Sequence, residues 1–543
     1  MLRRVGLLLL AVFCATAIAS ASYSSTAGAA PVNAWLPGHA AVLDEHGGLL
    51  PWTGYDNVLG LGWRFLEHVP VDTRAGLKTY LAYAVFDPDD VRGRYWQHNP
   101  ASLYASLVES VLPWYAYSGD AKAVEAVRDM LDYQLAHGTT PSSWAWPRVP
   151  FATSCAGARE YGRCLAGVDR RFYGGIEPDK VGLLGLGYLH FYELTGDRRY
   201  FAAAVACGRA LARHVRAGSD ARTPWAFRID ARTGRTLAGA EYGGMIVAPV
   251  QLLDELARLG GPERRTYTRA RDVAWRWMLR HQLDSRSRDY NRWSGYYEDI
   301  SFAPDDLNQA APTTTADWLL TSPSARRLDP HAVTHARMLL DWVRGYLGRG
   351  PFDGAWAIDE QRTPGRTGCC SQAGLGSDTA RWAAAAALLA QRTGDRRLHA
   401  QALRSLGYAT YFMDRQGRVS CCGGTGRNAY WFSDGYGDYL GSISRALGAV
   451  PSLAPRGETH LLVSTSVVQR VRYARRRVAY RTFAQSSVET LRLAFFPRRV
   501  LADGRPLRRI DRLGRSGFTV SPVVGGFVVR VRHDGARHVV LAG

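Results

Sequence analysis

Helical segments recur through most of this chain of 543 residues, and their spacing restricts its possible folds more than any other feature. The segments return roughly every 60–75 residues, which suits a helical hairpin with a long loop. One set is apolar on nearly every face, as in 181–194 and 380–392, and this predicts helices buried on all sides. We expect these inner helices to begin near the following residues: Pro100, Pro178, Gly244, Pro312, Ser377 and Ser433.

The helices between them carry arginine and aspartate on one face and apolar residues on the other. Segments 121–137 and 396–413 show this pattern, which is typical of helices exposed on one side. Gly-Asp pairs at 119–120 and 394–395 precede them; glycine accommodates a positive φ and aspartate caps the next helix. With an amphipathic segment at 74–85 as the first outer helix, the pattern predicts six inner and six outer helices.

Six such hairpins over about residues 55–450 resemble the six-hairpin glycosidase superfamily. The resemblance implies a mainly α fold, an (α/α)6 toroid whose inner helices surround a funnel, and a carbohydrate-active enzyme. A purely structural helical-repeat array is the alternative. From about residue 458 short alternating segments predict strands. We therefore expect a catalytic toroid at 31–455 and a C-terminal β-sandwich-like module at 456–543.

The first 30 residues have the pattern of a secretory signal peptide. Arg3 and Arg4 precede an apolar stretch and then small residues, so we expect a secreted, extracellular protein. No later stretch is apolar for long enough to predict a membrane anchor. The formal net charge of +20 is spread thinly along the chain, and the strong preference for arginine over its three lysines is typical of codon bias in a GC-rich genome. We therefore expect no nucleic-acid partner.

The chain has eight cysteines, and removing Cys14 with the signal peptide leaves an odd number. Cys207 lies among small apolar residues, which predicts a buried free thiol. Cys155 and Cys164 are close enough in sequence to pair locally. Two vicinal pairs then remain, and an oxidising compartment favours disulfides between the loops that carry them. The predicted disulfide cysteines are Cys155, Cys164, Cys369, Cys370, Cys421 and Cys422.

Two other interpretations of the vicinal pairs involve zinc. A four-thiolate site usually spaces its paired ligands as C-x2-C, which adjacent cysteines do not match. The Cys421-Cys422 dipeptide also resembles that of the zinc-cysteine β-L-arabinofuranosidases, in which one cysteine is a nucleophile on zinc. However, Gly423 and Gly424 follow the dipeptide, and no glutamate lies two residues before Cys369 or Cys370. The family's residues are therefore not transferred, and we expect neither a metal nor another cofactor.

Carboxylates beside aromatic residues are the candidate catalytic groups. Glycoside cleavage needs a proton donor and a second carboxylate, and aromatic rings both stack on sugars and raise a neighbouring acid's pKa. Glu298 and Asp299 follow several aromatic residues, so we predict that one of them works with Asp434. The alternative is an aromatic-lined core, and acids in first helical turns also offset the helix dipole. Further candidates before the inner helices are Glu177, Asp179, Glu241 and Glu360.

The expected partner is an oligo- or polysaccharide, neutral or acidic, and the expected reaction is hydrolysis. A polysaccharide lyase or uronate C5-epimerase is the first alternative, because tyrosine bases with asparagine or glutamine could serve it. A non-catalytic glycan-binding protein is the second. Lys180 is one of the rare lysines and could contact Asp179 or a substrate carboxylate. The predicted substrate-binding residues are Trp144, Trp146, Tyr173, Lys180, Tyr242, Tyr296, Tyr297, Asn308, Gln309, Trp431 and Tyr436.

Overall fold

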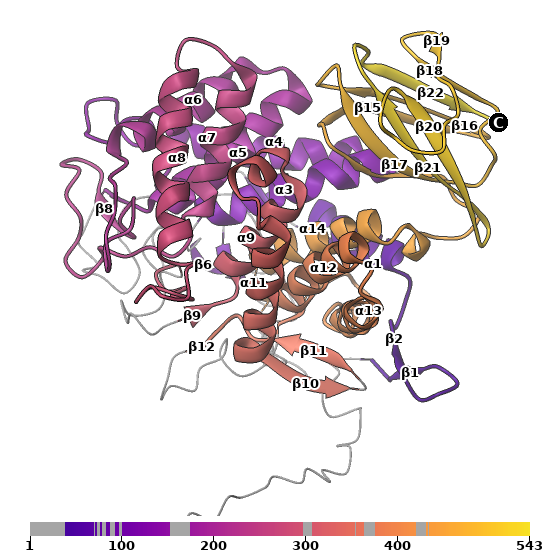
Figure 1. Cartoon of the computed structure of the whole chain (residues 1–543), viewed down its shortest axis with the longest axis horizontal. Coiled ribbons are helices and arrows are strands. Elements are labelled where there is room, and N and C mark those ends of the chain that lie inside the picture. The colour runs from indigo at the N-terminus through magenta and orange to yellow at the C-terminus, as the bar shows by residue number, and fades with distance from the viewer. Residues whose placement is uncertain are drawn as a thin grey trace, which may run out of the picture.

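A ring of helical hairpins forms the larger part of the protein (Figure 1). The computed structural model describes residues 39–69, 71–72, 77–78, 83–86, 93–96, 100–151, 174–296, 307–352, 354–362, 375–419, 431–432 and 434–543. Within these ranges six inner helices follow one another around the ring, and the last contacts the first. The inner helices are α3 (Pro100–Ser118), α5 (Pro178–Thr195), α7 (Val247–Leu259), α9 (Ala310–Thr321), α12 (Gly376–Thr393) and α14 (Asp434–Ala449).

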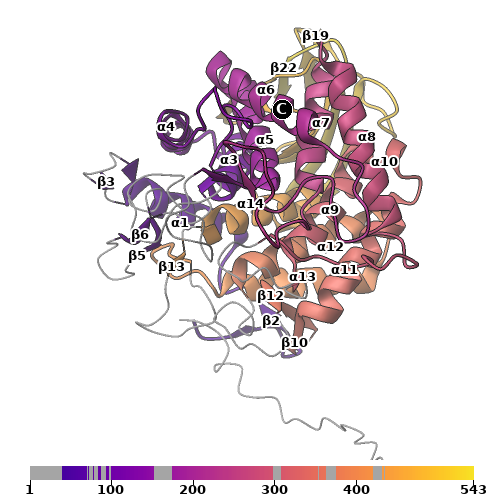
Figure 2. The same cartoon turned by 90° about the vertical axis from the view of Figure 1, so that its left-hand side faces the viewer.

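Six further helices in the same ranges cover the ring from outside, each against an inner helix (Figure 2). The predicted mainly α toroid is therefore confirmed, with inner helices starting within three residues of the expected positions. The short helix α10 (Pro323–Leu328) lies between α9 and the fourth hairpin's outer helix. The outer helices are α1 (Tyr55–His68), α4 (Ala121–His137), α6 (Arg198–His214), α8 (Arg264–Arg280), α11 (Ala332–Leu347) and α13 (Arg396–Thr410).

The prediction of a first outer helix at 74–85 is wrong. Residues 77–78 and 83–86 are strands β4 and β5, and the first outer helix is α1, about twenty residues earlier. Its buried residues include Val58, Leu59 and Leu66, which share one helical face. Glycines in α1 lower its helix propensity, so burial of this apolar face decides the outcome.

The expected Gly-Asp turns are confirmed at the ends of three inner helices. Gly119, Gly196 and Gly394 all have positive φ, which closes α3, α5 and α12. The next residue caps the outer helix: the Asp120 side chain accepts hydrogen bonds from two backbone N–H groups of α4, and Asp197 caps α6 likewise.

Short strand pairs hold together the loops that lead into the inner helices. The strands before α5 and α9 pair with segments from neighbouring loops, as does the strand before α14. The ends of the inner helices are thereby fixed relative to one another. The pairs are β7 (Gly175–Ile176) with β8 (Ile229–Asp230), β9 (Leu307–Asn308) with β12 (Gln361–Arg362), β13 (Trp431–Phe432) with β5 (Tyr83–Phe86), and β5 with β6 (Gly93–Trp96).

Other short pairs lie elsewhere on the helical domain. They are β1 (Val42–Leu43) with β2 (Leu49–Leu50), β3 (Val71–Asp72) with β4 (Leu77–Lys78), and β10 (Gly348–Phe352) with β11 (Ala355–Ile358).

The C-terminal part is a sandwich of two antiparallel sheets, as expected. After α14 and a short 3-10 turn at Pro451–Leu453, the first sheet has strands β14 (His460–Ser464), β17 (Ser487–Leu493), β21 (Gly526–His533) and β20 (Gly517–Val523), in that order. The second has β15 (Val468–Ala474), β16 (Arg477–Thr482), β22 (His538–Ala542), β18 (Arg499–Ala502) and β19 (Arg505–Pro506).

The sandwich packs on the C-terminal ends of the inner helices. Ala116, near the end of α3, belongs to the sandwich core, and Tyr473 donates a hydrogen bond to its carbonyl oxygen. Gln469 donates to the carbonyl oxygen of Glu193, near the end of α5. The sandwich therefore packs on the C-terminal ends of α3, α5 and α14, away from the loops that join β7, β9 and β13 to the inner helices (Figure 1).

Cys207 is a buried free cysteine on α6, as predicted. Burial raises the pKa of its thiol to about 12, which makes it unreactive. The six cysteines expected in disulfides lie outside the described residues, so their pairing stays a prediction. In the described part of the chain, no helix combines the length and apolar character required to cross a membrane.

Glycines allow inner helices to approach closely, which gives a test of the ring. A Cβ atom on Gly182 would lie 2.5 Å from the backbone nitrogen of Pro249 on α7, whereas one on Gly60 of α1 would meet only the Arg64 side chain at 3.8 Å. We expect Gly182→Ala to lower the stability by about 1–3 kcal/mol through overpacking. Gly60→Ala should raise it by about 0.5–1 kcal/mol. Melting temperatures test this, and an equal rise for both variants would refute the close packing.

Candidate active site

Charged side chains gather at the N-terminal ends of the inner helices. Pro178 starts α5, and the carboxylates of Glu177 and Asp179 flank it, where the helix dipole favours negative charge. Ile176 on β7 is paired with Ile229 on β8. Because the strands are antiparallel, this register places Arg228 beside Glu177.

These residues form a buried ionic cluster. The Arg228 Nε atom lies 2.8 Å from Glu177 Oε1, and the Lys180 Nζ atom lies 3.0 Å from both Glu177 Oε2 and Asp179 Oδ2. The side chains of Glu177, Lys180 and Arg228 are fully buried. Buried charges are tolerated only when they are paired, and here two cations meet two carboxylates. The sequence suggested that Lys180 contacts either Asp179 or a substrate carboxylate, and the contact with Asp179 is present.

Tyr296 covers this cluster. The Lys180 Nζ atom lies 4.0 Å from the centre of its ring and also donates a hydrogen bond to its backbone carbonyl. Its hydroxyl lies 3.2 Å from the Ser102 Oγ atom on α3. Burial raises the pKa of Tyr296 to about 12. Tyr296 therefore connects the ends of α3 and α5 and stays a neutral phenol.

Asp179 has the protonation behaviour of an acid. Burial raises its pKa to about 6; the positive charge of Lys180 opposes this rise, and the negative charge of Glu177 adds to it. Its side chain is 9% exposed, whereas those of Glu177 and Lys180 are 0% exposed. Of these three groups, Asp179 is the one that reaches the surface of the cluster. A carboxyl group in such a place can donate a proton near neutral pH.

A second ionic cluster lies on α12 and α14. Arg381 forms an ion pair with Asp438, and its Nη1 atom lies 3.9 Å from Asp378 Oδ1. Gln309, the residue before α9, donates a hydrogen bond of 2.6 Å to the same Asp378 oxygen. Asp378, Arg381 and Gln309 are buried, but the Asp438 side chain is 34% exposed. Asp438 therefore presents a carboxylate that solvent or a substrate can reach.

The two clusters belong to one site. Lys180, Arg381 and Asp438 all act electrostatically on the Tyr296 hydroxyl. Their helices, α5, α12 and α14, join with α3 and α9 at the same end of the ring. Asp179 and Asp438 therefore belong to neighbouring clusters that meet at Tyr296, at the same end of the ring.

For several predicted residues, the whole residue or its side chain lies outside the described part of the chain. Glu298, Asp299, Tyr173 and Tyr297 are not among the described residues. Asp434 starts α14 and Trp431 lies on β13, but their side chains are not described either. The proposed pair of Glu298 or Asp299 with Asp434 therefore stays a prediction.

The other two predicted acids, Glu241 and Glu360, make the following contacts. Glu241 forms an ion pair with Arg216, with 2.9 Å between Arg216 Nη2 and Glu241 Oε2. Glu360 lies between β11 and β12, where its carbonyl oxygen accepts a hydrogen bond from the Gln309 backbone. This second contact places Glu360 beside the start of α9 through its backbone.

The predicted aromatic residues mostly have structural contacts. Trp146 is buried and stacks on His214; Tyr436 is buried, stacks on Phe65, and accepts a hydrogen bond from a backbone N–H. Tyr242 donates a hydrogen bond to the Arg292 carbonyl. Trp144 is half-buried against Phe151, and Asn308 accepts a hydrogen bond from the first turn of α9. Trp146 and Tyr436 therefore fit the alternative interpretation, in which the predicted aromatic residues belong to the core.

The sequence reasoning missed Asp438, Arg381, Arg228 and Ser102. A signal was present for two of them: Asp438 follows Asp434 by one helical turn, and Asp378 precedes Arg381 by three residues. Arg228 had none, because only the strand pairing of β7 with β8 brings it to Glu177.

One group of residues outside the site has ligands suited to a metal ion. Asp220, His281 and Asp289 bring possible ligand atoms within 4.8 Å of one another. Asp289 already accepts hydrogen bonds from Arg292 and the Ala221 backbone N–H. These contacts explain the group as a structural link between two loops.

No protein-family model and no curated protein sequence matches this chain. Among solved structures, D-mannose isomerase is similar over 72% of this chain and 96% of its own, with 14% identity and a TM-score of 0.52. A sugar epimerase from a ruminal bacterium is similar over 72% and 98%, with 12% identity and a TM-score of 0.51. At these identities the likeness concerns the fold alone, and it confirms the predicted (α/α)6 toroid of helical hairpins.

Proposed function

We propose that this protein is a carbohydrate-active enzyme that hydrolyses glycosidic bonds at the N-terminal ends of its inner helices. One observation carries the proposal: Asp179, an acid with a pKa of about 6, shares the site with the more exposed carboxylate of Asp438. Glycoside hydrolysis requires a pair of this kind. The toroid fold, shared with enzymes that act on sugars, is consistent with it but does not choose the reaction.

The two carboxyl groups have different tasks. Asp179 donates its proton to the glycosidic oxygen, so that the leaving sugar departs as an alcohol. Asp438, oriented by Arg381, either directs a water molecule to the anomeric carbon or attacks that carbon itself, with water completing the reaction. Lys180 and Arg228 hold Glu177 and Asp179 in place, and Tyr296 shields this part of the site from water.

Two of the tyrosines that could be the base of a lyase or epimerase are poorly suited to it. Such enzymes remove a proton beside a carboxylate with a tyrosine, histidine or lysine, and a tyrosine must ionise readily to do so. Burial raises the pKa of Tyr296 to about 12 and also raises that of Tyr242. These two tyrosines therefore favour an acid-assisted hydrolysis over proton abstraction.

We also propose that the protein acts outside the cell. The support is the signal-peptide pattern in its first 30 residues. Cleavage of this segment in an exporting host, measured by N-terminal sequencing of the secreted protein, tests the proposal.

Removing either carboxyl group should abolish most of the activity without unfolding the protein. We expect Asp179→Asn and Asp438→Asn each to lower kcat about 10²–10⁴-fold, because each loses an acid or base function. Turnover is measured on a panel of neutral and uronic glycans, with melting curves in parallel. Asp284→Asn is the control, because Asp284 pairs with Arg286 on the loop after α8. The proposal is contradicted if both variants hydrolyse normally while Asp434→Asn does not. The catalytic pair would then be the one predicted from the sequence, Asp434 with Glu298 or Asp299.

The pH profile should show the titration of Asp179. The acid works only when protonated, so kcat/KM should fall above pH about 6, by about tenfold for each further pH unit. Asp179→Asn should remove this alkaline limb from the residual activity. A profile of the parent enzyme that stays flat from pH about 5 to 8 would show that Asp179 is not the acid.

A further inference from the structure

The positive charge of the chain is concentrated in its sandwich rather than thinly spread as its sequence suggested. Residues 456–543 contain 18 arginines, no lysine and five acidic residues, so their formal charge is +13 of the total +20. The other 455 residues carry only +7. A codon bias toward arginine does not explain why acidic residues are scarce in this module alone.

The strand register gathers part of this charge on one sheet. Arg470 on β15 is paired with Arg481 on β16, and Arg481 is paired with His538 on β22. Four residues further along the same strands, Arg477 is paired with Ala542, which is paired with Arg499 on β18. Two basic rows therefore cross the sheet.

These residues all face solvent. The alternate positions Val471, Val478, Tyr480, Val539 and Leu541 fill the core between the sheets, so the intervening residues point outward. The outward arginines are exposed, and together they form what we call the arginine face: Arg470, Arg472, Arg477, Arg481 and Arg499.

The arginine face has no internal counter-charge. Strands β15, β16, β18 and β22 contain no aspartate or glutamate. Among the acids of the module, Glu489 is buried and bonded to Tyr480, and Asp503 accepts hydrogen bonds from the backbone N–H groups of Arg537 and His538. Within the described chain none of the five arginines has a carboxylate partner.

Like charges directly opposite each other lower the stability of a sheet, and Arg470 with Arg481 is such a pair. An external anion would relieve this repulsion. Guanidinium groups bind carboxylates in a bidentate manner, which makes arginine better suited than lysine to this task. The arrangement therefore calls for a ligand with several negative charges.

We propose that the arginine face binds a linear polysaccharide that carries carboxylate groups. The two basic rows lie four residues apart, about 13 Å along the strands. The row between them contains Arg472 and the apolar residues Ala479, Val540 and Leu501. A chain of uronic sugars offers the matching chemistry, since its carboxylates would meet the arginines while its C–H faces cover the small apolar residues. Neither basic row includes a phenylalanine, tyrosine or tryptophan, the rings that most often stack on the bases of single-stranded nucleic acids.

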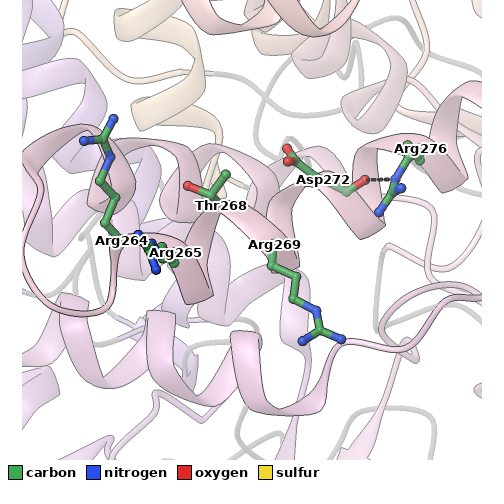
Figure 3. A pocket seen from close by; sticks show the side chains of 6 residues that line it. All are labelled: Arg264, Arg265, Thr268, Arg269, Asp272 and Arg276. Atoms are coloured by element: carbon green, nitrogen blue, oxygen red, sulfur yellow. Dashed lines mark hydrogen bonds between the residues drawn. The ribbon is translucent and has the colours of Figure 1, made fainter.

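A second basic surface, on α8, lacks this organisation. Arg264, Arg265, Arg269 and Arg276 line a shallow pocket of about 540 Å³ together with Asp272. Figure 3 shows Arg264 and Arg269 pointing away from each other, and Arg276 donates a hydrogen bond to the Asp272 carbonyl. This surface has a comparable excess of arginine but no rows across a sheet, which makes it a matched control.

The inference rests on the proposed function in one respect: the polymer held by the sandwich would be the glycan that the site hydrolyses. The sandwich packs on the C-terminal ends of α3, α5 and α14, away from the site, so it would tether the enzyme to the polymer while the site engages another segment or strand. Such tethering raises the effective concentration of substrate without changing the chemistry.

Binding of the full-length protein to polygalacturonate tests the proposal, with neutral dextran, single-stranded DNA and phosphatidylglycerol vesicles as other ligands. Affinity is measured by biolayer interferometry at low and at physiological salt. We expect the triple variant Arg470→Ala, Arg477→Ala, Arg481→Ala to bind polygalacturonate at least about tenfold more weakly than the parent. The control Arg264→Ala, Arg265→Ala, Arg269→Ala removes equal charge and should change affinity less than about threefold.

Equal losses in the two triple variants would overturn the proposal, since binding would then follow net charge alone. It also fails if the parent does not bind polygalacturonate, or if the sandwich variant loses affinity for DNA or vesicles but not for the polysaccharide. The sandwich variant should melt no lower than the parent, because it removes a like-charge pair. Failure of the proposed function looks different: the parent binds polygalacturonate through the arginine face but hydrolyses no glycan.

Discussion

The buried ammonium group of Lys180 is the constraint on which the site depends. It lies between two carboxylates, Glu177 and Asp179, and against the ring of Tyr296, with no exposure to water. An unpaired charge in such a place would cost several kcal/mol, so each partner must stay in position. Their positions come from three elements: the first turn of α5, the β7–β8 pair that brings Arg228, and the loop that carries Tyr296. The ionic cluster thus fixes the β7–β8 pair and the loop of Tyr296 relative to the first turn of α5.

This constraint also sets the chemistry that we propose. Burial leaves the carboxyl group of Asp179 poorly hydrated, and the negative charge of Glu177 adds to this effect, so the pKa of Asp179 rises although the charge of Lys180 opposes the rise. Asp438 has Arg381 as its ion-pair partner and a more open position. Two carboxyl groups in different surroundings can act as acid and as base or nucleophile in one reaction.

Most of the fold could be predicted from the sequence, because it depends on local patterns. All-round apolar segments predicted the inner helices, and Gly-Asp turns predicted where hairpins close. The first outer helix was missed because glycines weaken α1 locally, while its buried face stabilises it through packing. Cys207 was predicted from the small apolar residues around it.

The site was less predictable, because its contacts join distant segments. Glu177, Asp179 and Lys180 could be found, since they begin a recognisable helix. Arg228 could not, because only the strand pairing of β7 with β8 brings it in, and the ion pair of Arg381 with Asp438 depends on the order of the helices around the ring. The same reason applies to the arginine face, whose rows exist only through the register of β15, β16 and β22. Aromatic residues misled in part, since Trp146 and Tyr436 belong to the core.

A structure of the Asp179→Asn variant with an uncleaved oligosaccharide tests the central claim most directly. Our account predicts that the side chain of residue 179 lies within about 3 Å of a glycosidic oxygen. The Asp438 carboxylate should lie near the adjoining anomeric carbon. Its distance from the side-chain end of residue 179 should be roughly 5–10 Å, the separation of the two catalytic carboxyl groups in glycosidases. A glycan bound at these helix ends with its glycosidic oxygens away from residue 179, or one bound only elsewhere, would contradict the account.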